Sequence, residues 1–210
     1  MTNALHIGID FDNTIACYDG VFFTAARERG LVPKDLARDK TSVRDYMRAN
    51  DIEDEWTNLQ GWIYGERMDL AKPYDGAQDF VRVALGAGQR VSIVSHKTRH
   101  PYLGPKYELH TAAREFLETE GFFDAANGGL DPKSAYFELT LNEKLARIGA
   151  LGCTHFIDDL PEFLMEESFP ADVSKILFDP YGHCAGGPFK VCRSWAEIAD
   201  FLLVSRVTGP

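Results

Sequence analysis

The sequence predicts an α/β fold: a doubly wound parallel β-sheet with an inserted α-helical subdomain. Two observations lead to this prediction. Short apolar runs rich in β-branched residues alternate with helical stretches along most of the chain, and one long segment near the N-terminus breaks that alternation. The 210 residues, of which 45% are hydrophobic and 26% charged, suffice for one such domain and exclude a disordered chain or a disulfide-stapled miniprotein.

Apolar runs that stop at turns or acidic residues are typical of strands buried in a parallel sheet. Helical stretches between them supply the crossovers that parallel strands need. The expected strands are 5–9, 90–95, 154–157 and 174–178, with a weaker edge candidate at 189–192, and the expected helices are 76–87, 106–120, 141–151 and 195–204.

The segment 15–71 contains no convincing strand and reads as helical pieces separated by Gly30, Pro33 and Gly61. Structureless connections longer than about 12–15 residues are uncommon, so an inserted helical subdomain is a better interpretation than a plain connection. Lys72-Pro73-Tyr74-Asp75-Gly76 reads as the turn that returns the chain to the sheet. We therefore predict a core domain over residues 1–14 and 73–210 and a helical subdomain over residues 15–72.

The formal net charge of −10 narrows the class of partners. An acidic surface repels phosphate backbones and anionic membranes, so neither polymeric nucleic acid nor a membrane is expected. No targeting signal or apolar run of membrane-spanning length is recognisable, and we expect a cytoplasmic protein. Cys17, Cys153, Cys184 and Cys192 show no disulfide or zinc spacing, and a site formed by His183, Cys184 and Cys192 is disfavoured.

The first expected strand ends in two carboxylates, Asp10 and Asp12. In extended backbone this spacing points both side chains the same way, while Phe11 points into the core. Repulsion favours ionisation of one carboxylate and protonation of the other, which is the division a nucleophile and a general acid need. The backbone carbonyl of Asp12 is also free to bind a hard cation. Taken alone, the segment could equally be a turn or a helix cap.

A second strand ends in the same way, at Asp158 and Asp159. Carboxyl ends of parallel strands share one edge of a sheet, where ligands bind, so Asp10, Asp158 and Asp159 should crowd together. A cation must then offset their charge, and an all-oxygen cluster that keeps waters suits Mg²⁺. Ser95 ends the strand 90–95 and can donate to an anionic oxygen, while Lys144 opens the helix before the Asp158 strand and can bring positive charge.

The order of these motifs resembles that of the haloacid dehalogenase (HAD) superfamily of phosphotransferases. The resemblance rests on Asp10-Phe11-Asp12-Asn13-Thr14, Ser95, Lys144 and the pair Asp158-Asp159. It spans nearly the whole chain, and it implies a Rossmann-like core with a helical cap at the family's first insertion point. Pro73-Tyr74-Asp75-Gly76-Ala77 resembles the usual return from such a cap.

The resemblance implies phosphoryl transfer through a covalent intermediate. Asp10 would attack phosphorus, and Asp12 would protonate the leaving oxygen and then activate water. Mg²⁺ would be held by Asp10, the Asp12 carbonyl and the Asp158-Asp159 pair, of which the second aligns better with the direct ligand. Lys144 would offset the repulsion between carboxylates and phosphate. With Asp12 present, phosphate ester hydrolysis is favoured over dehalogenation, and phosphomutase activity stays open.

Substrate contacts are expected around these motifs. Ser95 and backbone N–H groups around Phe11 would donate to the phosphoryl oxygens, and Thr14 would secure the turn. The cationic stretch around His96, Lys97 and Arg99 suggests that Lys97 or Arg99 contacts a second anionic group or the leaving portion, with a solvated loop as the alternative. The expected substrate-binding residues are Phe11, Asp12, Thr14, Ser95, His96, Lys97 and Arg99.

Cap side chains that could line a substrate pocket are Trp56, Trp62, Tyr64 and Arg67, although the two tryptophans suit the cap's own core better. A helical lid favours a small phosphorylated molecule as the substrate. A receiver-like signalling module phosphorylated on Asp is the main alternative from another class, but its acidic pair belongs to the first strand and its lysine follows the other motifs. Neither the identity of the substrate nor the oligomeric state can be read from this sequence.

Overall fold

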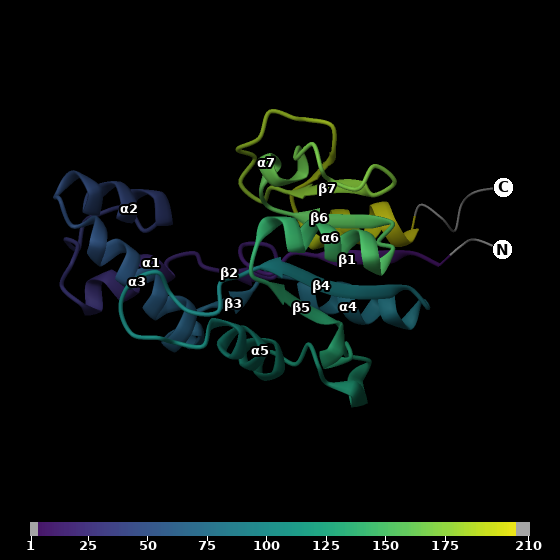
Figure 1. Cartoon of the computed structure of the whole chain (residues 1–210), viewed down its shortest axis with the longest axis horizontal. Coiled ribbons are helices and arrows are strands. Elements are labelled where there is room, and N and C mark those ends of the chain that lie inside the picture. The colour runs from purple at the N-terminus through teal and green to yellow at the C-terminus, as the bar shows by residue number, and fades with distance from the viewer. Residues whose placement is uncertain (1–3, 205–210) are drawn as a thin grey trace.

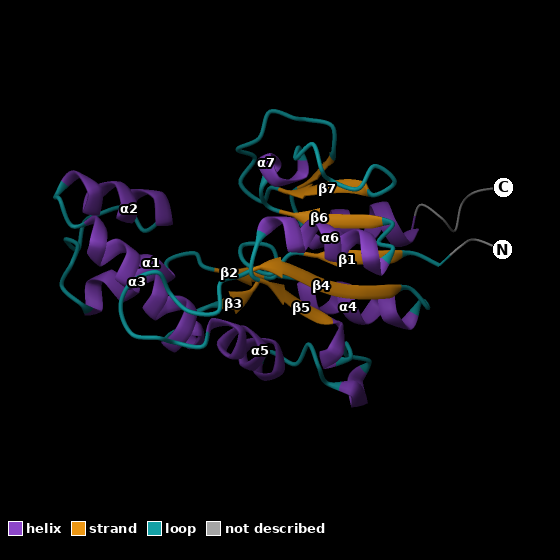
Figure 2. Ribbon diagram, viewed as in Figure 1, coloured by secondary structure: helices purple, strands orange, loops and turns teal. Residues whose placement is uncertain are grey.

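A six-stranded parallel sheet forms the centre of the computed structural model, which describes residues 4–204 (Figures 1 and 2). The strand order is β5-β4-β1-β6-β7-β8, and every neighbouring pair is parallel. The fold class predicted from the sequence is confirmed. The sheet strands are β1 (His6–Ile9), β4 (Arg90–His96), β5 (Ala135–Glu138), β6 (His155–Asp158), β7 (Ser174–Phe178) and β8 (Lys190–Cys192).

The order of the strands places a ligand crevice beside β1. After β1 the chain builds outward on one side through β4 and β5, and then crosses to the other side for β6, β7 and β8. Strand order therefore reverses at β1, and open α/β sheets bind ligands at such a switch point, beyond the carboxyl ends of the strands. Asp10 and Asp158 lie at this point because Asp10 directly follows β1 and Asp158 ends β6.

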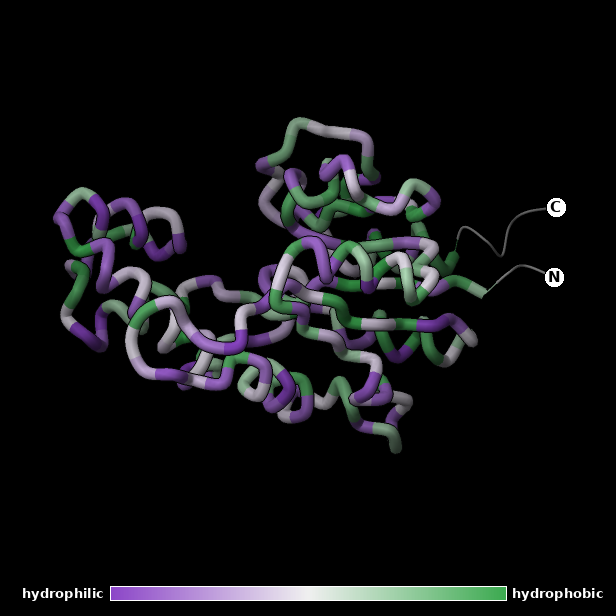
Figure 3. Tube along the Cα trace, viewed as in Figure 1, coloured by the Kyte–Doolittle hydropathy of each residue, from purple (hydrophilic) through white to green (hydrophobic). Residues whose placement is uncertain are grey.

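Successive side chains of the strands point alternately into two apolar layers, one on each face of the sheet. Ile93, Ile157 and Ile176 belong to the larger hydrophobic cluster, whereas their neighbours Val94 and Phe156 belong to the smaller one. This period of two is what a sheet covered on both faces requires. Figure 3 shows hydrophobic residues concentrated along the strands.

Gly8 illustrates how tightly the smaller layer packs. A Cβ atom at Gly8 would lie 2.5 Å from a ring carbon of Phe156 and 3.1 Å from the sulfur of Cys153. Only glycine leaves the space that the Phe156 ring occupies at the centre of the sheet.

Helices cover both faces of the sheet. Residues of α6 and α7 contribute to the smaller cluster, and residues of α4, α5 and α8 contribute to the larger one. The helices of the core are α4 (Ala77–Gly86), α5 (Leu109–Thr119), α6 (Leu141–Leu151), α7 (Pro161–Leu164) and α8 (Trp195–Ala199), with 3₁₀ turns η2 (Ala125–Asn127) and η3 (Pro132–Ser134) and a π-helical end η4 (Asp200–Val204).

The segment between β1 and α4 is mostly helical and extends beyond the sheet, to the left in Figure 1. It contains α1 (Val21–Glu28), α2 (Lys40–Ala49), α3 (Glu53–Glu66) and the 3₁₀ turn η1 (Met68–Leu70). Two short antiparallel strands, β2 (Ala16–Cys17) and β3 (Lys72–Pro73), pair where the chain leaves and re-enters the core. We call this helical segment the cap, and the predicted boundaries of the two domains remain predictions.

Two expectations about the cap were wrong. The expectation of no strand in 15–71 missed β2, because two residues are too short to show a period. Gly61 does not separate helices, since α3 runs through it. A Cβ atom at Gly61 would lie 2.5 Å from the Cβ of Pro101, and one at Gly65 would lie 2.2 Å from the Cβ of Tyr107. These glycines therefore allow a loop of the core to approach α3 closely.

That loop is the segment 99–108, which we call the strap. Its two ends are joined by a hydrogen bond from the Leu109 N–H to the Arg99 carbonyl, 3.0 Å, and by an ion pair between Arg99 and Glu108. The strap follows β4 and packs on α3, so it links the strand that carries Ser95 to the cap.

None of the helices in residues 4–204 has both the length and the apolar character needed to cross a bilayer. All four cysteines, whose residues lie within this range, are free thiols. Within the same range no three His, Cys, Asp or Glu side chains are grouped closely enough to form a ready-made metal site.

Candidate active site

The centre of the candidate site is a buried lysine between two aspartates. The Nζ atom of Lys144 lies 2.7 Å from Oδ1 of Asp10 and 2.6 Å from Oδ2 of Asp158. All three side chains are buried. Asp10 and Asp158 come from the carboxyl ends of adjacent strands, and Lys144 comes from the first turn of α6.

The start of α6 is fixed by a reciprocal cap. The Thr140 hydroxyl accepts a hydrogen bond from the Glu143 N–H, and the Glu143 carboxylate accepts one from the Thr140 N–H. This capping box fixes the first turn of the helix and therefore the position of Lys144. The ring of Phe163 lies 3.9 Å from the Lys144 ammonium and shields it from water.

The charges of these groups do not cancel within the protein. Burial raises the pKa of Asp10, and the nearby Asp158 carboxylate raises it further, although Lys144 opposes both effects. Burial and the carboxylates of Asp158 and Asp10 likewise raise the pKa of Asp159. Burial alone would lower the pKa of Lys144, but the two carboxylates raise it above its usual value. One lysine thus faces three carboxylates, and negative charge is in excess.

Asp158 and Asp159 have different surroundings. Both oxygens of Asp158 are occupied, one by Lys144 and the other by the Leu160 N–H at 2.9 Å, and its side chain is fully buried. Among the described residues, the Asp159 carboxylate receives one side-chain hydrogen bond, a long one of 3.4 Å from the Thr14 hydroxyl. Asp159 is therefore the member of the pair that can turn toward a ligand.

Asp12 points to a different set of partners. Its Oδ2 lies 2.6 Å from the Lys97 ammonium, and its Oδ1 accepts a hydrogen bond of 2.6 Å from the hydroxyl of Tyr18. Lys97 is only 5% exposed and packs against the rings of Phe11 and Tyr64, at 5.4 and 4.8 Å. The loop after β1 turns at Asn13, whose φ of +57° is left-handed. Both oxygens of Asp12 are thus held by side chains that the first motif does not include.

The structure brings some of the other expected residues to this edge and leaves others away from it. Phe11 is buried against Phe116 and Phe137, as its alternation with Asp10 and Asp12 predicts. Ser95 is buried in β4, one residue before its end. His96 is exposed and its Nε2 lies 3.1 Å from the carbonyl oxygen of Leu139.

The ion pair of Arg99 with Glu108 lies at the base of the exposed strap. The two cations of the stretch after Ser95 therefore have separate partners: Lys97 is bonded to Asp12, and Arg99 is bonded to Glu108. Whether either one contacts substrate remains a prediction.

The aromatic residues of the cap also occupy different places. Trp56 is buried against Phe22 within the cap, and the ring of Trp62 contacts the guanidinium groups of Arg29 and Arg67. Tyr64 alone among the four candidates contacts residues of the site, because its ring lies over Lys97 and its hydroxyl accepts from Lys40.

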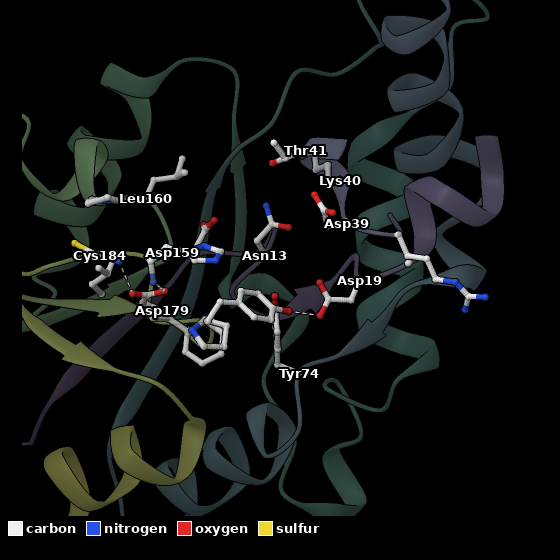
Figure 4. Close-up of a pocket in the computed structure, with 18 of the residues that line it drawn as sticks. Asn13, Asp19, Asp39, Lys40, Thr41, Tyr74, Asp159, Leu160, Asp179 and Cys184 are labelled. Atoms are coloured by element: carbon white, nitrogen blue, oxygen red, sulfur yellow. Dashed lines mark hydrogen bonds between the residues drawn. The ribbon is translucent and has the colours of Figure 1, made fainter. Parts of the chain in front are cut away.

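An open cleft of about 1180 Å³ lies between the cap and the core (Figure 4). Its core wall includes Asn13, Asp159 and the loop that follows β7, and its cap wall includes Arg38, Asp39, Lys40 and Thr41. Asp39, Lys40 and Thr41 face Asn13 and Asp159 across it in Figure 4. The cleft therefore reaches the acidic edge of the sheet at Asp159.

Two groups near the site were not anticipated from the sequence. Tyr18 follows the first motif, but nothing in its local pattern shows that its hydroxyl turns back to Asp12. Lys40 lies far along the chain at the start of α2. Burial lowers the pKa of Lys40, and the charges of Asp12 and Asp159 oppose this effect. The only sequence signal is the N-cap Asp39, which marks the start of a helix but not the side of the helix that meets the core.

No protein-family model and no curated protein sequence matches this chain. Solved structures do match it over nearly its whole length. A predicted phosphatase from Clostridium acetobutylicum is 15% identical, with a TM-score of 0.59 over 97% of this chain and 100% of its own.

Two further structures are similar. A HAD family hydrolase from Deinococcus radiodurans, with bound phosphate and sodium, is 15% identical, with a TM-score of 0.57 over 99% and 98% of the two chains. A magnesium-bound HAD hydrolase from Bacillus subtilis is 13% identical, with a TM-score of 0.53 over 96% and 100%. Identities this low establish the fold, and the chain has the fold of the haloacid dehalogenase superfamily of hydrolases.

Proposed function

We propose that this chain is a Mg²⁺-dependent phosphohydrolase that cleaves a small phosphorylated metabolite through an aspartyl-phosphate intermediate. The observation that supports this most strongly is the Asp10–Lys144–Asp158 cluster at the switch point of the sheet, with Asp159 beside it on the cleft. The phosphate bound to the Deinococcus radiodurans structure and the magnesium bound to the Bacillus subtilis structure agree with this chemistry.

The donor set fits Mg²⁺. The ion is usually held by one or two carboxylates and keeps several waters, so a ready group of three carboxylates is not required. Asp10 and Asp159 would be the carboxylate ligands, because each has an oxygen without a strong partner among the described residues, and the backbone carbonyl of Asp12 would be the third protein ligand. Asp158, with both oxygens occupied, would orient Lys144 instead. When bound, the ion would neutralise charge on the phosphoryl oxygens and on the nucleophile.

Asp10 is the proposed nucleophile. Lys144 holds Oδ1 at 2.7 Å, which leaves Oδ2 to attack phosphorus as the bond to the leaving oxygen breaks. Asp12 would give its proton to that leaving oxygen. It would then take a proton from the water that attacks phosphorus, breaks the Asp10–phosphate bond and releases inorganic phosphate. Lys97 and Tyr18 would hold the Asp12 carboxylate in place between the two steps.

Ser95 and the N–H groups near Phe11 would donate to the phosphoryl oxygens, and Lys144 would offset the charge that accumulates between phosphate and carboxylates. Thr14 would orient Asp159 through their hydrogen bond. The cap would exclude water from the reacting groups and admit a small substrate.

The test is steady-state release of inorganic phosphate from p-nitrophenyl phosphate and from a panel of phosphorylated metabolites. We expect turnover that depends on Mg²⁺, is abolished by EDTA and is restored by added Mg²⁺. Release of free phosphate over many turnovers distinguishes a hydrolase from a phosphomutase and from a receiver-like module that is phosphorylated once.

Asp10→Asn should lower turnover on the order of 10³-fold or more, because the nucleophile is removed. Asp45→Asn is a matched control, since Asp45 is an exposed carboxylate on α2 paired only with its neighbour Arg44. Full activity of Asp10→Asn would contradict the mechanism. No Mg²⁺-dependent phosphate release from any substrate of the panel would contradict the proposed function.

A further inference from the structure

Lys40, at the start of α2, presents an unusual charge to the cleft. Its Nζ atom donates to the hydroxyl of Tyr64 at 3.0 Å and lies 4.8 Å from the ring of Phe22. An ammonium group has three donors, and no second acceptor and no carboxylate lies within bonding distance of Lys40 among residues 4–204. Two N–H donors of a partly buried cation are thus free for a ligand.

No carboxylate of the described cleft lining forms an ion pair with Lys40, and three of these carboxylates are bonded to other groups. Asp19 accepts a hydrogen bond from the Tyr181 hydroxyl, and Asp39 accepts from Ser42 as the N-cap of α2. Asp179 accepts from the backbone N–H groups of His183 and Cys184, and so organises the loop after β7. The cap wall carries the two cations Arg38 and Lys40 against the one carboxylate of Asp39, so it is positive on balance although the protein as a whole is strongly acidic.

A second cation belongs to the same part of the cap wall. Arg38 lines the cleft two residues before Lys40, and within the described part of the chain it forms no ion pair either. Its guanidinium lies 5.4 Å from the ring of Phe23. Lys40 and Arg38 make this wall attractive to an anion, and Figure 4 places Lys40 across the cleft from Asn13 and Asp159.

From this arrangement we infer that Lys40 binds a second anionic group on the leaving portion of the substrate. The preferred substrate is then a phosphomonoester with a further phosphate or carboxylate, held with its transferred phosphoryl group at Asp10 and its second anion at the cap wall. This inference rests on the proposed function and specifies its substrate class. It assigns to Lys40 the role that sequence reasoning gave to Lys97 or Arg99, which are bonded to Asp12 and Glu108.

The competing role for Lys40 is contact with the transferred phosphoryl group itself. The two roles differ in one respect that can be measured. A lysine that contacts the transferred group affects every phosphomonoester alike, whereas a lysine that contacts the second anion affects only the substrates that have one.

The test compares alkanediol bisphosphates of two to six carbons with alkyl monophosphates of the same lengths. In the wild type, kcat/KM should be higher for the bisphosphates, with an optimum at the chain length that spans the cleft. Lys40→Met should lower kcat/KM for the best bisphosphate about 10- to 100-fold more than for its monophosphate, mainly through KM. Lys40→Arg should restore part of the preference. Lys34→Met is the matched control, because Lys34 is an exposed lysine of the cap outside the cleft.

Binding of non-hydrolysable propane-1,3-bisphosphonate and propylphosphonate, measured by calorimetry with Mg²⁺, separates this inference from the proposed function. Tighter binding of the bisphosphonate that is lost in Lys40→Met supports the inference even if no substrate is turned over. Equal effects of Lys40→Met on both members of each pair, in kinetics and in binding, would overturn it while leaving the phosphohydrolase intact.

Discussion

Lys144 brings positive charge to the site from the core, and Lys40 brings it from the cap. The two lysines differ in whether carboxylates of the protein are bonded to them. Lys144 comes from the core, has a side chain only 4% exposed, and is bonded to two aspartates. Lys40 comes from the cap, and its one hydrogen bond within residues 4–204 goes to a tyrosine hydroxyl. The core therefore pairs the charge of its lysine within the protein, whereas the cap wall presents a positive charge that a ligand can neutralise.

This difference follows from how each region is built. The end of a parallel sheet brings side chains of several strands to fixed positions, so a buried ion-pair cluster can be satisfied in the folded protein itself. The cap contributes its residues from the start of one helix on the opposite wall of an open cleft. The groups that carry out chemistry are thus fixed by the sheet, while the groups that face the rest of the substrate belong to the insert.

The largest expected effect is a loss of stability on replacing Lys144, the lysine of the core. Lys144→Met leaves the carboxylates of Asp10 and Asp158 buried without their partner, which should lower the free energy of unfolding by about 3–5 kcal/mol. Lys40→Met removes a cation with no carboxylate partner and should change it by less than about 1 kcal/mol. Urea denaturation of both variants measures the difference. Equal losses of stability in the two variants would show that the regions do not differ in this way.

A second prediction concerns the attachment of the cap. Gly65→Ala places a methyl group against Tyr107, where its Cβ would lie 2.2 Å from that of the tyrosine, and it should destabilise the protein by about 1–3 kcal/mol. Gly86→Ala is the matched control, because Gly86 is also helical and, apart from the backbone around it in its own helix, no described atom lies within 4 Å of the added carbon. It should be neutral or stabilising by up to about 1 kcal/mol. Thermal unfolding compares them, and no loss of stability in Gly65→Ala would mean that the strap does not pack tightly on α3.

The smallest expected effect is a pH dependence of stability caused by His6, a buried residue of the core at the amino end of β1. The Nδ1 and Nε2 atoms of His6 lie 2.9 Å from the Leu151 carbonyl and 2.8 Å from the Ser92 hydroxyl, an arrangement that suits a neutral imidazole donating through Nδ1. Burial lowers the pKa of His6, with a smaller contribution from Arg90, although the bond to Leu151 opposes this. The unfolded chain therefore binds a proton more readily, and stability should fall as the pH drops below about 6.5.

The slope attributable to His6 should not exceed about 1.4 kcal/mol per pH unit. His6→Gln should reduce the dependence of the urea midpoint on pH between 7 and 5.5. An unchanged slope in His6→Gln would show that the buried histidine is not responsible.

Most strands of the sheet could be predicted from the sequence, because strands buried in a parallel sheet are continuous apolar runs. The expected strand 174–178 coincides with β7, and the other expected strands agree with β1, β4, β6 and β8 to within a residue. The strand β5 (Ala135–Glu138) was missed, because it is short, lies at the edge and buries only two of its four residues fully. The expected helix 195–204 is divided into an α-helix and a π-helical turn.

Some contacts of the candidate site could also be predicted from the sequence, and others could not. Asp10, Asp158 and Lys144 could be predicted to meet because strand ends and helix starts have fixed places in a doubly wound sheet, and the structure brings them within hydrogen-bond distance. The partners of Asp12 could not be predicted, because Tyr18 and Lys97 reach it through side-chain directions that a linear pattern does not encode. The position of Lys40 depends on how the cap packs on the core, which is a long-range property of the fold.

The glycine seam between the strap and α3 has a mechanical consequence. The strap leaves the sheet two residues after Lys97 and presses on Gly61 and Gly65, so the cap has an attachment besides its two hinge strands. If the cap swings open and leaves the strap behind, the close contacts of Pro101 and Tyr107 with the two glycines must separate. If the strap moves with the cap, the backbone next to Lys97 moves too, and the grip on Asp12 changes with it. In the second case, the opening of the cap to substrate and the position of the Asp12 carboxylate are therefore coupled through the strap.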